Sequence, residues 1–178
     1  MSSVIETIRR NNGPGTLQTA TTWNGAAFVA GMVNLVRPLV AIEVGAHTGS
    51  TSAFIIEAIK MNDCGRFIAY EMDIVHAAET KRKLEDLWPG GAWEVKDGDF
   101  FKENARGPVN FAFIDIDPKV RYGDAYEDIE FAPGAVIVAH DITLYPDEIN
   151  PFRARLINEG WSTIVLPWER GFLVAVKP

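Results

Sequence analysis

The segment that most constrains this chain runs from Glu43 to Gly49 and reads Glu-Val-Gly-Ala-His-Thr-Gly. It follows an apolar run of β-forming residues at 39–44 and leads into a stretch with a helical pattern. This order predicts a strand, a tight turn at Gly45 and a helix whose N-terminus faces the space above the sheet. Glu71 ends the next apolar run, 26 positions after Gly45. A glycine turn followed by a carboxylate at this distance is typical of α/β proteins that hold an adenosine-bearing ligand.

The bulk properties indicate one ordinary globular domain. At 178 residues, with 47% hydrophobic and 23% charged residues, residues 1–178 are expected to form a single unit. We expect residues 1–38 to be a helical extension and residues 39–178 to be the cofactor-binding sheet. The net charge of −7 argues against a nucleic-acid partner, because binding phosphates requires clustered Lys and Arg.

The remaining compositional signals concern location. Cys64 is the only cysteine, which excludes an intramolecular disulfide and fits a reducing, cytoplasmic environment. The first twelve residues carry charges throughout and do not form the apolar core of a signal peptide. The longest apolar runs have the length of strands, so we expect no membrane-spanning segment.

Strand and helix patterns alternate from residue 39 onward, which predicts a doubly wound, Rossmann-like α/β fold. Before the sheet we expect a short helix at 4–10, a loop at 11–16 and a second helix at 22–36. The last two strands are separated by only four residues, too few for a crossover helix, so they must be antiparallel neighbours. The prediction is a seven-stranded, mostly parallel sheet with one antiparallel strand near its edge. The strands are expected at 39–44, 66–71, 92–96, 110–115, 135–140, 162–166 and 171–176, and the intervening helices at 50–61, 74–87, 122–131 and 147–158.

The residues at the ends of the first three strands suggest how an adenosine ligand would be held. A dinucleotide site would need a second glycine where this chain has His47, so that interpretation is weakened. Glu71 is suited to accept hydrogen bonds from both ribose hydroxyls. Asp99, in the turn after the third strand, is suited to an adenine amine, and Phe100 to the flat face of the ring. A plain strand-end acid and a plain Asp-Gly turn are the structural alternatives.

These segments, with Phe113-Ile114-Asp115-Ile116-Asp117 and Val136-Ile137-Val138-Ala139-His140-Asp141, resemble the class I S-adenosylmethionine-dependent methyltransferases. The resemblance covers residues 40–178, and within that superfamily the chain is most similar to the catechol O-methyltransferase-like and natural-product or sugar O-methyltransferases. It implies that the turn at Gly45 holds the methionine part of S-adenosylmethionine, with Glu43 below it orienting the turn. The cofactor-binding residues that it implies are Glu43, Gly45, Ala46, His47, Gly49, Ser50, Glu71, Met72, Gly98, Asp99, Phe100 and Asp115.

The ends of the fourth and fifth strands suggest a divalent metal site. Asp115, His140 and Asp141 lie at the ends of adjacent parallel strands, about 4.8 Å apart, so their side chains can converge. Carboxylates suit Mg²⁺ or Mn²⁺, which would bind a substrate hydroxyl and lower its pKa. Catechol O-methyltransferase-like enzymes have an acid, an acid and an amide at these three positions, so His140 departs from their pattern. This departure favours a softer metal or frees His140 to act as a base. The structural alternative is a His-Asp pair that bonds locally and orients the loop.

The catalytic base is the least determined residue. The family often places Lys or His where this chain has Pro118, and its neighbours Lys119 and Asp117 are candidates. His140 is the chemically better candidate, because an unperturbed imidazole titrates near neutral pH. Trp23, Tyr145 and Trp168 are candidates for the wall of the site, with core packing as the alternative for each.

The resemblance implies methyl transfer to a hydroxyl of a small molecule by direct displacement. Two other functions stay open: an adenosyl-cofactor-binding regulatory or scaffold protein without turnover, and a nicotinamide-dependent oxidoreductase. The chain has no insertion large enough to form a lid. Either the acceptor is partly exposed, or a second subunit of a homodimer covers it.

Overall fold

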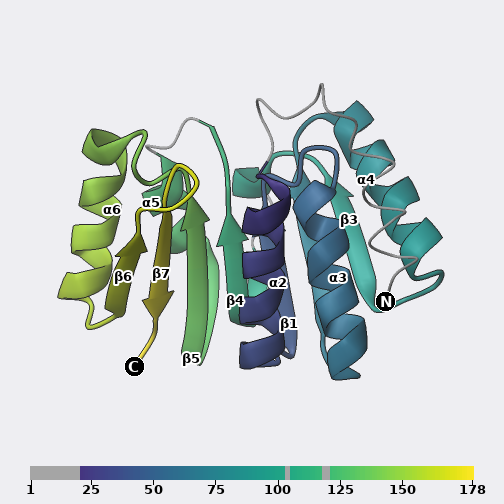
Figure 1. The fold of residues 1–178 in the computed structure, drawn as a ribbon, viewed down its shortest axis with the longest axis horizontal. Helices are drawn as coiled ribbons and strands as arrows, with labels where there is room; N and C mark the ends of the chain where they lie inside the picture. Colours follow the sequence, from purple (N-terminus) through teal and green to yellow (C-terminus); the bar gives the residue numbers. More distant parts are fainter. Residues whose placement is uncertain (1–20, 103–104, 118–120) are drawn as a thin grey trace.

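The computed structural model describes residues 21–102, 105–117 and 121–178 (Figure 1). The helix expected at 4–10, the loop expected at 11–16 and the residues Pro118 and Lys119 lie outside these ranges. Within them, strands and helices alternate from residue 40 onward. This alternation is what the sequence predicted.

A seven-stranded sheet forms the centre of the molecule, in the order β3-β2-β1-β4-β5-β7-β6. The first five of these strands pair in parallel, and β7 is antiparallel to both of its neighbours, β5 and β6. The prediction of a mostly parallel sheet with one reversed strand near the edge is therefore confirmed. The strands are β1 (Val40–Val44), β2 (Arg66–Glu71), β3 (Trp93–Asp97), β4 (Ala105–Ile114), β5 (Ile129–His140), β6 (Ser162–Leu166) and β7 (Phe172–Val176).

Helices cover both faces of the sheet and create two separate hydrophobic cores (Figure 1). On one face, α2 (Trp23–Val36), α3 (Ser50–Asn62) and α4 (Ile74–Leu87) pack against side chains such as Phe111 and Val138. On the other face, α5 (Tyr122–Glu127) and α6 (Pro146–Asn158) pack against side chains such as Ala112 and Ile137. The central strands are thus buried on both faces, which explains their nearly continuous apolar sequences.

The fold differs from the sequence expectation between residues 122 and 135. The helix expected at 122–131 ends at Glu127, and β5 begins at Ile129. Ile129 and Phe131 are buried and pair with β4 across two register shifts. Burial of these two apolar side chains against the sheet overrides the local helical pattern. A short 3₁₀ helix at Phe100–Lys102 was also not predicted.

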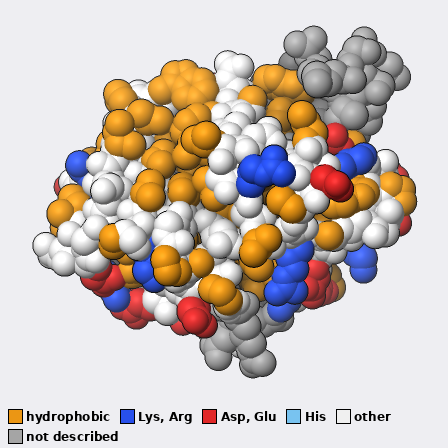
Figure 2. Space-filling view, turned by 90° about the horizontal axis from the view of Figure 1, so that it is seen from below, with side chains coloured by type: hydrophobic (Ala, Val, Ile, Leu, Met, Phe, Trp, Pro, Cys, Tyr) orange, Lys and Arg blue, Asp and Glu red, His pale blue; other side chains and the backbone are white. Residues whose placement is uncertain are grey.

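The two ends of the sheet differ in character. Figure 2 shows the end at which the parallel strands begin, where apolar side chains form a broad patch and charges of both signs are interspersed. Leu39, just before β1, is 67% exposed, and Met61, near the end of α3, is 63% exposed. The glycine turn and the acidic strand ends lie at the opposite, carboxyl end. Among the described residues, no helix has the length and hydropathy needed to cross a bilayer.

Candidate functional site

The turn after β1 depends on the absence of a side chain at Gly45. Gly45 has φ of +92°, and the N–H groups of Gly45 and Ala46 both donate to the carbonyl of Tyr70, at 3.0 and 3.1 Å. A Cβ atom at Gly45 would lie 2.2 Å from the carbonyl oxygen of Asp115. Glycine is therefore required here, both for the backbone conformation and for the close approach of β1 and β4.

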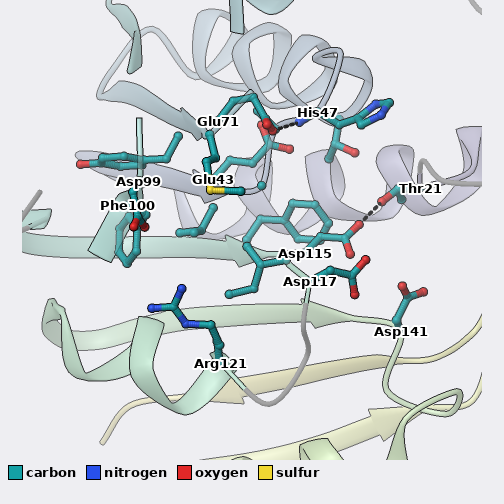
Figure 3. A pocket seen from close by; sticks show the side chains of 18 of the residues that line it. Thr21, Glu43, His47, Glu71, Asp99, Phe100, Asp115, Asp117, Arg121 and Asp141 are labelled. Carbon is teal, nitrogen blue, oxygen red and sulfur yellow. Dashed lines mark hydrogen bonds between the residues drawn. The ribbon is translucent and has the colours of Figure 1, made fainter. Parts of the chain in front are cut away.

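Glu71 links the end of β2 to this turn. One oxygen of its carboxylate accepts the backbone N–H of His47 at 2.6 Å (Figure 3), and the other accepts the N–H of Asp73 at 2.8 Å. Each carboxylate oxygen can accept more than one hydrogen bond. Glu71 can thus fix the turn and still receive hydroxyl donors from a ligand.

Glu43 is buried in the wall beneath the turn, with 1% of its surface exposed. Its carboxylate accepts a hydrogen bond from the hydroxyl of Ser52, in the first turn of α3. Burial raises the pKa of Glu43 from its ordinary value of 4.5 to about 8. The residue therefore joins β1 to α3 and carries a proton at neutral pH.

His47 occupies the position at which a dinucleotide site would have its second glycine. It has φ of +49°, and its ring lies against that of His76 on α4, with ring centroids 4.2 Å apart. Burial, followed by the nearby His76, lowers the pKa of His47. Its carbonyl accepts the hydroxyl of Thr80 at 2.8 Å, so α4 also holds the turn in place.

Gly49 has a structural role in the junction. It is the N-cap of α3, with φ of +76°, and a Cβ atom there would lie 2.9 Å from the side chain of Thr80. Gly49 therefore allows α3 and α4 to approach one another. It is not part of the cavity wall.

The turn after β3 forms the end of the site expected to hold adenine. Phe100 is 4% exposed and packs edge-on against Tyr70, with ring centroids 4.9 Å apart. The guanidinium of Arg121 lies 3.4 Å from the centroid of the Phe101 ring, so an arginine and an aromatic side chain together border this end. Phe100 thus serves the core as well as the cavity.

These elements enclose a cavity of about 550 Å³ at the carboxyl end of the sheet (Figure 3). The structure brings together most of the residues predicted from the sequence. Gly49 and His140 are outside the wall, and Lys119 lies outside the described residues. The predicted residues in the wall are Glu43, Gly45, Ala46, His47, Ser50, Glu71, Met72, Gly98, Asp99, Phe100, Asp115, Asp117 and Asp141.

The three residues proposed to bind a metal converge at the other end of the cavity. Potential ligand atoms of Asp115, His140 and Asp141 all lie within 4.8 Å of one another. The Nδ1 atom of His140 is 3.1 Å from Oδ2 of Asp115 and 3.5 Å from Oδ1 of Asp141. Neighbouring ligands around an octahedral ion with bonds of 2.0–2.1 Å are about 3 Å apart, so these spacings suit a divalent cation.

The orientation of the His140 ring supports the same role. The ring is 0% exposed, stacks on Phe172 and directs its Nε2 atom to the carbonyl of Glu169 at 3.2 Å. A carbonyl can only accept, so Nε2 carries a hydrogen, and Nδ1 faces the two carboxylates. Metal-bound histidines in proteins are oriented by this type of contact. His140 lies behind the acids, outside the cavity wall.

Thr21, Arg170 and Thr51 are among the wall residues that were not predicted. Thr21 donates its hydroxyl to Oδ2 of Asp115 at 3.1 Å (Figure 3). Arg170 forms an ion pair with Asp141 at 3.0 Å, and Thr51 of α3 lies in the wall at 5% exposure. For Thr21, the one local signal was its place beside Thr22, because threonine before a helical pattern indicates an N-cap and Thr22 caps α2. Nothing local distinguishes Arg170 from other arginines in turns.

The aromatic residues proposed for the wall differ in their positions. Tyr145 lines the cavity, whereas Trp23 packs edge-on against Phe54 at a ring distance of 4.7 Å. Trp168 is 43% exposed and lies beside Phe172, outside the cavity wall. Of the three, only Tyr145 lines the cavity.

Comparison with known proteins identifies the fold through structure and not through sequence. No protein-family model matches the chain, and no curated protein matches its sequence. A methyltransferase of Podospora anserina with bound S-adenosylhomocysteine (SAH) superposes with a TM-score of 0.84 at 12% identity, over 100% of this chain and 88% of that one.

Two O-methyltransferases show the same likeness. That of Bacillus cereus, in complex with SAH, gives a TM-score of 0.76 at 18% identity, over 99% of this chain and 90% of that one. The enzyme of Streptomyces achromogenes involved in tomaymycin synthesis, in complex with S-adenosylmethionine (SAM), gives a TM-score of 0.76 at 16% identity. The match covers 99% of this chain and 88% of that one. The chain therefore has the fold of class I SAM-dependent methyltransferases, as the sequence resemblance predicted.

Proposed function

We propose that this protein transfers the methyl group of SAM to a hydroxyl of a small molecule. The observation that carries this proposal is a single cavity that joins the glycine turn and Glu71 at one end to the acidic cluster of Asp115 and Asp141 at the other. The first end suits an adenosyl cofactor, and the second suits an acceptor hydroxyl. The SAM and SAH complexes among the similar structures support this assignment.

The cofactor would lie across the ends of β1, β2 and β3. The turn at Gly45 would border the methionine part, and the turn keeps its shape because a side chain there would meet the carbonyl oxygen of Asp115. Glu71 would receive the ribose hydroxyls, and Asp99 the adenine amine, each as a carboxylate accepting from a donor. The acidic cluster would then face the methyl group of the sulfonium.

The transfer itself is a direct displacement. The acceptor oxygen attacks the methyl carbon, the carbon–sulfur bond breaks with its electron pair going to sulfur, and the acceptor hydroxyl loses its proton. The products are the methyl ether, SAH and a proton. The protein contributes the alignment of the two reactants and the exclusion of water. Of the candidate bases, Asp117 lines the cavity and His140 lies behind it, so Asp117 is the described residue better placed to take the proton.

Asp115, His140 and Asp141 would hold a divalent cation, whose chemistry is to bind the acceptor hydroxyl and lower its pKa. Their convergence, the distances of 3.1 and 3.5 Å from Nδ1 of His140 to the two carboxylates and the orientation of the His140 ring all fit such an ion. Two carboxylates and one imidazole suit Mn²⁺ or another transition metal as well as Mg²⁺.

The test is incubation with methyl-labelled SAM and a panel of catechols and sugar hydroxyls, with and without EDTA. We expect label in at least one acceptor and loss of that transfer on chelation. Binding of SAH without transfer to any acceptor would favour a regulatory cofactor-binding protein. Binding of NADH in place of SAH would favour an oxidoreductase. Transfer that survives chelation would remove the metal from the proposal and leave the methyltransferase.

A further inference from the structure

The acidic cluster already has a cation beside it in the form of Arg170. The Nε atom of Arg170 lies 3.0 Å from Oδ1 of Asp141, and this same oxygen is 3.5 Å from Nδ1 of His140. The Asp141 side chain is only 9% exposed, and that of Arg170 is 31% exposed. The guanidinium therefore contacts the oxygen of Asp141 that faces Nδ1 of His140.

The backbone holds Arg170 in this position. The carbonyl of Arg170 accepts the N–H of Thr143 at 2.9 Å, and the carbonyl of Gly171 accepts the N–H of Ile142 at 3.3 Å. These bonds join the turn between β6 and β7 to the loop after β5. Asp141 and Arg170 have φ of +62° and +64°, a strained conformation that non-glycine residues keep only where the surrounding structure holds it. The surrounding contacts thus fix both partners of the ion pair.

The charge around the cluster explains why a cation is needed there. Carboxylate oxygens of Asp115 and Asp141 lie within 4.8 Å of one another, and Asp117 lines the same cavity. Carboxylates gathered in a partly buried site repel one another unless a positive charge accompanies them. Either a divalent cation or the guanidinium of Arg170 can supply that charge.

We propose that Arg170 competes with a divalent cation for Asp141. The ion reaches its full set of protein ligands only when the guanidinium leaves Oδ1 of Asp141, so Arg170 lowers the affinity of the site for the metal. Arg170 is a positioning residue, since it acts through the ligand Asp141. This inference rests on the metal site of the proposed function.

The experiment measures Mn²⁺ binding directly, from the electron paramagnetic resonance signal of free Mn²⁺ during a titration of the full-length protein. The central variant is Arg170→Gln, with Arg170→Met as a second variant should the first unfold. Arg121→Gln is the matched control, because Arg121 lines the same cavity but pairs with Asp124 on α5. Arg170→Lys keeps the positive charge. Circular dichroism establishes that each variant is folded, and calorimetry with SAH reports the cofactor site separately.

We expect Arg170→Gln to bind Mn²⁺ about tenfold or more tightly than the wild type, because a charge-assisted contact to the ligand is lost. Arg121→Gln and Arg170→Lys should stay within threefold of the wild type. Asp141→Asn should abolish binding in both the wild-type and the Arg170→Gln background.

Unchanged or weaker Mn²⁺ binding by Arg170→Gln would overturn the competition, while loss of binding in Asp141→Asn would still support the metal site. Equal tightening in Arg170→Lys and Arg170→Gln would also overturn it, because charge would not be the cause. Absence of Mn²⁺ binding from the wild type and every variant would overturn both the competition and the metal site. SAH binding in the same samples would then leave the cofactor assignment standing.

Discussion

The carboxylate of Glu71 accepts the backbone N–H of His47 at 2.6 Å and so ties the end of β2 to the turn after β1. This contact gives Glu71 two roles, because the residue proposed to bind the ribose also shapes the turn proposed to hold the methionine part of the cofactor. The contact therefore links the position of Glu71 to the geometry of the turn at Gly45.

Replacing Glu71 by Ala should weaken SAH binding tenfold to a hundredfold, because a charged acceptor for the ribose is lost. Isothermal titration calorimetry measures this change. Glu79→Ala is the control, since Glu79 is a part-exposed acid on α4 that pairs with Lys83. An unchanged affinity in Glu71→Ala would remove the ribose assignment.

Replacing Gly45 by Ala should destabilise the protein by about 3 kcal/mol or more, since a Cβ atom would meet the Asp115 carbonyl at 2.2 Å in a positive-φ conformation. Urea denaturation gives the free energy of unfolding. Gly31→Ala is the matched control: Gly31 lies inside α2, and a Cβ atom there meets nothing within 4 Å. That change should stabilise the protein by about 0.5–1 kcal/mol. Equal unfolding free energies for Gly45→Ala and the wild type would refute the steric argument.

Glu43 should make stability fall as pH rises. Its pKa is raised from 4.5 to about 8 in the folded protein, so between these values the folded state keeps a proton that the unfolded state has lost. The stability that comes from this proton is fully present below pH 4.5 and is lost by about pH 8. The slope is at most about 1.4 kcal/mol per pH unit.

The difference in unfolding free energy between the wild type and Glu43→Gln isolates this effect, because other titrating groups are common to both proteins. Glutamine is nearly isosteric with glutamic acid and keeps a partner for Ser52, which bonds to Glu43 in the wild type. We expect the difference to change steadily from pH 5 to pH 8. Parallel stability curves for the two proteins over this range would show that Glu43 does not titrate there.

Replacing His140 by Asn should lower Mn²⁺ affinity and kcat together, because the imidazole is the proposed ligand beside Asp115 and has no exposed surface. Some loss of stability is also expected, since the ring stacks on Phe172 and directs Nε2 to the Glu169 carbonyl. If His140 were instead the base, kcat would fall while Mn²⁺ binding stayed intact. Measuring both quantities on one preparation decides between the two roles.

The sequence predicted the parts of the fold that local patterns specify. The turn at Gly45 needs a residue without a side chain, and the four-residue link at 167–170 allows only antiparallel neighbours. The start of β5 was missed because Ile129 and Phe131 are held in the strand by pairing with β4, and this pairing forms only when the sheet assembles. No local pattern records such a contact.

In the candidate site, too, some residues could be predicted from local patterns and others reach the site only through the tertiary fold. Glu71 and Asp115 were predicted because each ends a recognisable apolar strand. Thr21 and Arg170 lie far apart in the chain, and each reaches the acidic cluster only through the tertiary fold, by way of Asp115 and Asp141 respectively. The exclusion of Gly49 from the cavity has the same origin, because its contact with Thr80 depends on how α3 and α4 pack.

The most direct test of the account is calorimetric titration of the folded protein with SAH. The account predicts saturable one-to-one binding that is weakened by Glu71→Ala and preserved in Glu79→Ala. A wild-type protein that is folded by circular dichroism and yet binds no SAH would contradict it.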